Sequence, residues 1–173
     1  MKRTKKLFLL LFFPLLLIQC EKTDDGTYTK PITVYEKMAG TWSLTSIKLI
    51  DEIAKASSIT PNEVELKTRF GFSDFAITFS VDADSLPTTF EVAGNAPELF
   101  LNNGYWDLDH PFTHTDGTPS KIFLYSDETK NQLVDSLSIT AIPGSRAELE
   151  FKLTRQSEGT PYASYLYKLS LDQ

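Results

Sequence analysis

Apolar and polar residues alternate along much of this chain, and the alternation predicts strands. It is clearest in residues 75–82, where Phe75, Ile77, Phe79 and Val81 are separated by small or polar residues. A period of two gives a segment one apolar and one wettable face, as a half-buried strand requires. This segment is therefore the best-defined predicted strand.

Residues 148–153 and 164–171 alternate in the same way near the end of the chain. They are joined by residues 156–161, a connection that contains Gly159 and Pro161. Such turn-rich connections between alternating segments predict a hairpin.

Five weaker segments bring the predicted strands to eight, at residues 41–50, 88–92, 104–108, 121–125 and 133–140. The spacing of the turn signals between them is typical of an all-β sandwich or barrel. One short helix is predicted at Thr60-Pro61-Asn62-Glu63, because a capping hydroxyl precedes proline and an acidic residue follows three positions later.

The first nineteen residues have the pattern of an export signal. Residues 1–6 carry four positive charges, residues 7–18 are almost entirely apolar, and Cys20 follows. A membrane-spanning helix needs about 20 apolar residues, and this shorter run contains Pro14. Residues 1–19 are therefore predicted to be a signal peptide, and the small residues of ordinary secretory cleavage are missing before Cys20.

The segment Leu17-Ile18-Gln19-Cys20 resembles the bacterial lipobox, with Gln19 where a small residue is usual. The resemblance implies that Cys20 is acylated and anchors the mature chain in a lipid bilayer. The alternative is a plain signal peptide with an unrelated cysteine. Residues 20–31 are predicted to be an acidic flexible linker. Its start, Glu21–Gly26, resembles the signals that place Bacteroidetes lipoproteins on the outer face of the outer membrane; the alternative is the periplasmic leaflet.

Residues 32–173 carry a second resemblance. Gly40-Thr41-Trp42 opens the first strand and resembles the Gly-x-Trp signature of lipocalins. The wider pattern, including Asn103–Asp109, resembles the lipocalin-like domains of uncharacterised Bacteroidetes lipoproteins (DUF5004-like). This implies an eight-stranded antiparallel up-and-down barrel, in which Trp42 plugs the closed end and Gly40 allows the tight turn before it. The alternative is a β-sandwich with Trp42 in its core.

The interior of an eight-stranded barrel is either filled by side chains or holds one small ligand. The chain has twelve Phe, seven Tyr and two Trp residues, mostly at alternating positions. Both a filled interior and a ligand cavity stay open on this evidence. Tyr105 and Trp106 are the candidate ligand residues, because a surface Trp beside acidic and amide groups can stack on a sugar. The alternative for Trp106 is an inward-facing barrel residue.

Charge limits the partners. Four of the 17 basic residues and none of the 23 acidic residues lie in residues 1–19, so the remainder has a formal net charge of −10. Nucleic-acid binding needs clustered Lys and Arg, and no tract concentrates them. We expect no nucleic-acid partner.

Residues 107–117 hold both histidines of the chain, His110 and His114, together with Asp107, Asp109 and Asp116. Imidazole and carboxylate ligands would suit zinc, but a proline and an Asp-Gly turn disfavour a helical scaffold. We expect a solvated acidic loop without a metal.

The motifs of nucleophilic catalysis and the glycine loops that bind phosphate are missing from the sequence. We therefore expect no enzyme activity and no cofactor. Two functions remain. The barrel binds a small apolar or glycan-derived ligand, or a filled barrel docks as an interaction subunit on an outer-membrane protein assembly.

Overall fold

The computed structural model describes residues 26–172, and its compact unit begins at Ile32. The predicted signal peptide, Cys20 and the linker up to residue 25 lie outside the described residues. In the described part of the chain, no helix is both long enough and apolar enough to cross a bilayer. The elements in chain order are α2 (Val34–Met38), β1 (Gly40–Asp51), α3 (Glu52–Ala56), β2 (Glu63–Glu65), the 3₁₀ helix η2 (Phe72–Asp74), β3 (Ala76–Val81), β4 (Pro87–Ala93), β5 (Asn103–Leu108), β6 (Lys121–Tyr125), β7 (Leu133–Ala141), β8 (Glu148–Ser157) and β9 (Thr160–Leu171).

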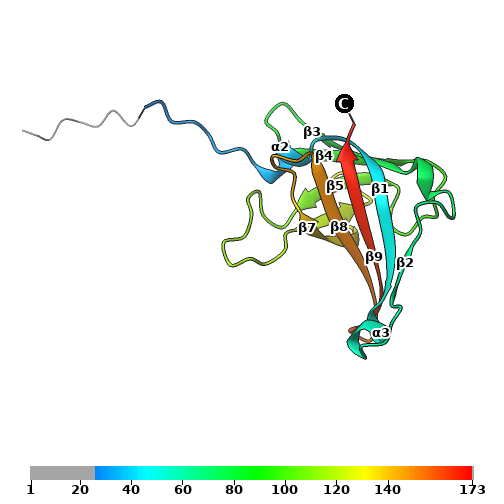
Figure 1. Cartoon of the computed structure of the whole chain (residues 1–173). Helices are drawn as coiled ribbons and strands as arrows, with labels where there is room; N and C mark the ends of the chain where they lie inside the picture. The colour runs from blue at the N-terminus through cyan, green and yellow to red at the C-terminus, as the bar shows by residue number, and fades with distance from the viewer. Residues whose placement is uncertain (1–25, 173) are drawn as a thin grey trace, which may run out of the picture. The chain divides into compact units, whose positions relative to one another are not determined.

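The strands form one antiparallel sheet that closes on itself. From β3 to β9 each strand pairs with the next, and β1 pairs with both β3 and β9. The long strands β8, β9 and β1 lie side by side and run toward α3 (Figure 1). The fold is therefore the expected eight-stranded up-and-down barrel, because a β-sandwich would need two separate sheets. The remaining strand, β2, has three residues, and they pair with the second half of β1.

The helix predicted at residues 60–63 is wrong. Residues 60–62 are not helical, and Glu63 begins β2. The helix in this region is α3, because the Asp51 carboxylate accepts hydrogen bonds from the backbone N–H groups of Ile53 and Ala54 and caps its N-terminus. The backbone N–H of Asp51 donates to the carbonyl of Asn62 at 2.9 Å, which aligns the following residues with β1.

The short helix α2 lies at the end of the barrel where β1 begins. A capping box stabilises it: the Thr33 hydroxyl accepts from the Glu36 N–H, and the Glu36 carboxylate accepts from the Thr33 N–H. Its apolar residues Val34, Tyr35 and Met38 are buried. We call this end the α2 end; the β4–β5, β6–β7 and β8–β9 connections lie at the opposite end.

Alternate residues of the strands fill the barrel. Fully buried aromatic side chains come from several strands and connections, namely Trp42, Phe72, Phe79, Phe90, Trp106, Phe151 and Tyr167. Toward the opposite end, the ring of Phe151 stacks on that of Tyr167 with centroids 5.0 Å apart. Of the two interiors that the sequence left open, these contacts favour the filled one in this region.

Candidate functional site

Gly40 and Trp42 lie at the α2 end. Trp42 is fully buried, and its indole Nε1 donates a 2.7 Å hydrogen bond to the carbonyl of Met38 in α2. Gly40 has a φ of 125°, and a Cβ at this position would lie 3.0 Å from the Leu171 side chain. Both residues thus pack the start of β1 against α2 and β9, which is a structural role.

Trp106 is not available to a ligand on the surface. It is fully buried, and its Nε1 donates to the carbonyl of Ser80 at 2.9 Å. Its ring packs against Phe79 at 4.9 Å and, edge-on, against Tyr35 at 6.0 Å between centroids. The expectation that Trp106 offers a face to a sugar is therefore wrong, and the inward-facing alternative holds. Period-two alternation puts Trp106 and Leu108 on the buried face.

Tyr105, the residue before Trp106 in β5, faces outward and lines a pocket of about 460 Å³. Thr89 pairs with Tyr105, and Glu91 pairs with Asn103 across β4 and β5, so these four side chains share the outer face. We call this hollow the Tyr105 pocket. It is lined by Thr89, Phe90, Glu91, Leu101, Asn103, Gly104, Tyr105 and Ser126.

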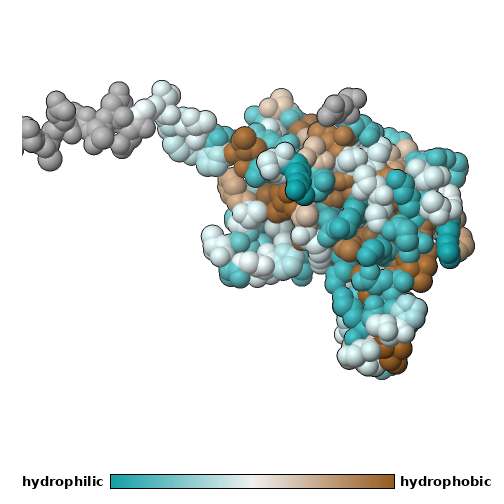
Figure 2. Space-filling model, in the orientation of Figure 1, coloured by the Kyte–Doolittle hydropathy of each residue, from teal (hydrophilic) through white to brown (hydrophobic). Residues whose placement is uncertain are grey.

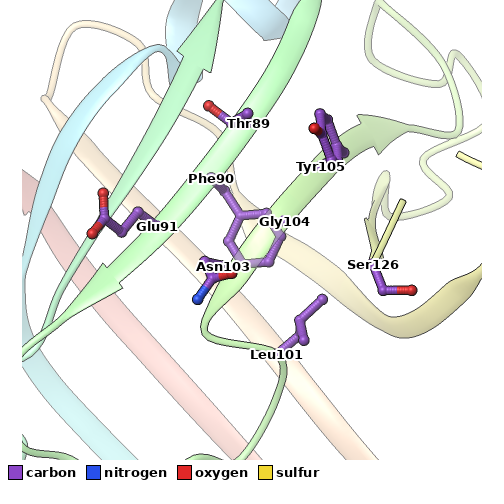
Figure 3. A pocket seen from close by; sticks show the side chains of 8 residues that line it. All are labelled: Thr89, Phe90, Glu91, Leu101, Asn103, Gly104, Tyr105 and Ser126. Carbon is purple, nitrogen blue, oxygen red and sulfur yellow. The ribbon is translucent and has the colours of Figure 1, made fainter. Parts of the chain in front are cut away.

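The lining combines two aromatic rings, those of Tyr105 and Phe90, with several polar groups. Figure 3 shows Tyr105 and Ser126 on one side and Glu91 on the other, with Leu101 and the Phe90 ring between them. Gly104 leaves room here, because a Cβ at this position would overlap the carbonyl oxygen of Tyr125 and approach Phe90 to 3.4 Å. The floor of the pocket therefore consists of the Gly104 backbone and the edge of the buried Phe90 ring.

The β6–β7 connection forms the wall that contains Ser126. It is fixed by Lys130, whose Nζ donates to Asp107 Oδ2 at 2.8 Å and to the carbonyl of Pro87 at 3.0 Å. Asp107 also accepts from the hydroxyl of Tyr35, at 3.1 Å. Burial and the charge of Asp107 raise the pKa of Tyr125, which lies next to the wall. These contacts tie the wall to β4, β5 and α2.

The polar groups of the Tyr105 pocket are open to a ligand. Glu91, Asn103 and Thr89 are exposed, and Tyr105 is partly buried. Within residues 26–172, the side chains of Glu91, Asn103 and Tyr105 have no protein hydrogen-bond partner. The volume falls in the range of small-molecule sites, which is about 300–1,000 Å³. The pocket can therefore place donors, acceptors and an aromatic face around one small molecule.

Residues 109–117, which we call the histidine loop, contain fewer groups that could hold a ligand in place. His114 Nε2 lies 3.1 Å from Asp109 Oδ2, and the ring centroids of His110 and His114 are 5.6 Å apart. The other oxygen of Asp109 accepts from the backbone N–H of Lys121. Among the described residues, no group of three His, Cys, Asp or Glu residues is arranged to hold a metal ion. The expectation that this loop binds no metal stays a prediction.

Comparison with protein families gives a match. The model of a domain of unknown function, DUF5004, matches residues 19–170. Comparison with curated proteins and with solved structures finds no match. The matched region includes every helix and almost all of the strand residues described above. The chain therefore belongs to the DUF5004 family.

Proposed function

We propose that this chain is a lipid-anchored, non-catalytic binding protein whose Tyr105 pocket takes a glycan-derived ligand. One observation carries the proposal: the Tyr105 ring, the Asn103 amide and the Glu91 carboxylate surround the same pocket without hydrogen-bond partners in the described chain. The apolar C–H face of a sugar packs on an aromatic ring, while its hydroxyls need donors and acceptors in fixed positions.

The filled interior supports a surface ligand rather than a buried apolar one. The side chains of Phe100, Phe151 and Tyr167 occupy the barrel toward the opposite end, with centroids 5.0–6.1 Å apart. A ligand in that space would have to displace them, whereas the Tyr105 pocket is already formed. Preformed sites bind without the cost of reorganising the protein.

Charge restricts the class of glycan. Glu91 places a carboxylate in the pocket, and residues 20–173 carry a formal net charge of −10. An anionic ligand would be repelled by both. We therefore propose neutral or amino-sugar oligosaccharides rather than sulfated or phosphorylated ones.

The proposed anchor rests on the sequence. The lipobox-like segment ends at Cys20, and the family match begins one residue before it, at residue 19. Two or three acyl chains would hold the protein stably at a bilayer surface, which one chain does not do. We propose the outer face of the outer membrane as the location, with the periplasmic leaflet as the alternative.

Binding is tested with full-length protein in detergent and a panel of neutral, amino-sugar and sulfated oligosaccharides, measured by calorimetry. A neutral or amino-sugar probe should bind, and Tyr105→Ala should weaken the binding by about fivefold or more, taking as a scale the roughly 1–3 kcal/mol per ring of bases stacked on aromatic side chains. Tyr162→Ala is the matched control, since Tyr162 is 45% exposed and does not line the pocket. The proposal fails if no probe binds or if both variants behave alike. The saccharide should be recovered unchanged.

The anchor is tested separately by Cys20→Ser. The wild-type chain should carry an acyl mass on Cys20 as its first residue, and the variant should keep its signal segment and lack the acyl group. Mass spectrometry of the membrane fraction checks both. A wild-type N-terminus at another residue, without an acyl mass, would contradict the anchor and leave the pocket untouched.

A second candidate function is docking on a protein partner. Seven of the eleven large apolar side chains that are exposed among the described residues belong to elements or connections near the opposite end of the barrel, namely Ile53, Ile59, Val64, Phe70, Leu133, Val134 and Tyr162. Figure 2 shows apolar surface at the tip that carries α3. Concentrated exposed apolar groups favour an interaction surface.

A further inference from the structure

The β4–β5 connection sends Phe100 into the barrel. Its side chain is 6% exposed, and its ring centroid lies 5.7 Å from Tyr167, 6.1 Å from Phe151 and 6.4 Å from Phe75. All three contacts are edge-to-face, the arrangement that aromatic pairs prefer. The connection thus places one aromatic ring among three others, those of Phe75, Phe151 and Tyr167, which we call the aromatic box.

The backbone on either side of Phe100 is held by a charged pair. The N–H of Leu101 donates to Asp135 Oδ2 at 3.0 Å, and the carbonyl of Leu99 accepts from the guanidinium of Arg155. Asp135 and Arg155 also contact each other, at 3.4 Å between Oδ1 and Nη1. The two charged residues therefore recognise the backbone of a tripeptide, while the aromatic box recognises its central ring.

Asp135 and Arg155 lie where a barrel normally places apolar groups. Asp135 pairs with Leu124 across β6 and β7, and Arg155 is two residues beyond Leu153 on the inner face of β8. The Asp135 side chain is 11% exposed, whereas that of Arg155 is 39% exposed, so Asp135 is the buried charge of the pair. Charges at such positions are costly unless they are paired and hydrogen-bonded, and backbone groups of Leu99 and Leu101 supply part of this pairing.

We propose that the opposite end of the barrel is a peptide-binding site, which residues 99–101 occupy from within the same chain. Its ligand is an extended segment of a partner protein with an aromatic residue between two aliphatic residues. The occupant in the structure defines this chemistry: a ring for the aromatic box, a carbonyl for Arg155 and an N–H for Asp135. The exposed apolar side chains near this end provide further contact area for the partner.

The intramolecular segment competes with the partner. A tethered segment acts at an effective concentration on the order of millimolar, so a free peptide binds weakly while Phe100 is in place. Because the Phe100 ring competes with the free peptide, removing the ring should raise the apparent affinity of the protein for that peptide. This site goes beyond the proposed glycan function and does not depend on it, although the Leu101 side chain also lines the Tyr105 pocket.

The test uses a fluorescent peptide with the sequence of residues 98–102, Glu-Leu-Phe-Leu-Asn, and full-length protein. Phe100→Ala should bind it at least about tenfold more tightly than wild type does, as measured by fluorescence polarisation. A peptide with alanine in place of its phenylalanine should not bind. Equal binding of both peptides by the folded variant, or no binding at all, would overturn the proposal.

Phe100→Ala leaves a cavity, so circular dichroism must show that the variant folds. If it does not fold, Phe100→Leu decides, because leucine keeps most of the apolar volume while making a poorer occupant of the box. We expect about threefold tighter peptide binding than for wild type, and no gain would overturn the proposal. Tyr105→Ala should leave peptide binding unchanged, so failure here is distinct from failure of the glycan function.

Discussion

Replacing Trp42 by alanine tests how the α2 end is held together. The side chain is fully buried, and its Nε1 donates to the carbonyl of Met38. Removing a buried Trp costs about 3–5 kcal/mol through lost burial and a residual cavity. For a domain of this size, each kcal/mol changes the melting temperature by roughly 3–4 °C. Trp42→Ala should therefore lower the melting temperature by about 10–20 °C.

Two matched variants separate the contributions. Trp42→Phe keeps an aromatic ring but leaves the Met38 carbonyl without its donor, at a cost of about 1–3 kcal/mol for an unsatisfied buried group. Tyr162→Ala removes an exposed aromatic residue and should change the free energy of unfolding by less than about 0.5 kcal/mol. Thermal and urea unfolding followed by circular dichroism measure all three. A decrease of only about 2 °C for Trp42→Ala would refute the reasoning.

Three further predictions concern other parts of the barrel. Gly104→Ala should destabilise the fold by more than about 1 kcal/mol, because its Cβ would overlap the Tyr125 carbonyl and its φ is 152°; urea unfolding measures this. Burial and a nearby carboxylate raise the pKa of Tyr35 from 10.0 to about 12. Between these pH values the unfolded chain loses this proton first, so stability falls as pH rises, and Tyr35→Phe should show a smaller fall in unfolding experiments. His110→Ala with His114→Ala should leave the melting temperature and the metal content of purified protein unchanged.

Each of these predictions has a control or a contrary result. Gly144→Ala should be nearly neutral, since no atom lies within 4 Å of the added Cβ; equal effects at both glycines would contradict the steric argument. An alkaline fall in Tyr35→Phe as large as that of the wild type would contradict its assignment to Tyr35. Stoichiometric zinc that disappears in the double histidine variant would show that the loop is a metal site.

Period-two alternation made the barrel strands predictable. Residues 121–125 form a strand as predicted. The predicted strand at residues 75–82 extends one residue beyond the observed strand, Ala76–Val81, at each end. Alternation also contained the signal for the burial of Trp106, because Asp107 and Asp109 occupy the opposite positions from Trp106 and Leu108. This pattern distinguishes the outward-facing Tyr105 from the buried Trp106.

Local capping and long-range contacts explain what the sequence did not reveal. Asp51 is a better start for a helix than Thr60, because it is followed by five residues that include two alanines, a glutamate and a lysine. The Tyr105 pocket needs Ser126 from another connection. Likewise, Phe100 meets residues of β8 and β9 that are far away in sequence. Such juxtapositions follow from barrel closure and leave no local pattern.

The most direct test of the central claim is to locate the ligand on the protein. In a ¹H–¹⁵N NMR titration of the wild-type chain with the best-binding oligosaccharide, saturable shifts should cluster at residues 89–91, 103–105 and 126, which line the Tyr105 pocket. The amide signals of the histidine loop, residues 109–117, should not shift. Saturable shifts confined to that loop, or no saturable shifts at all, would contradict the proposal that this pocket binds glycans.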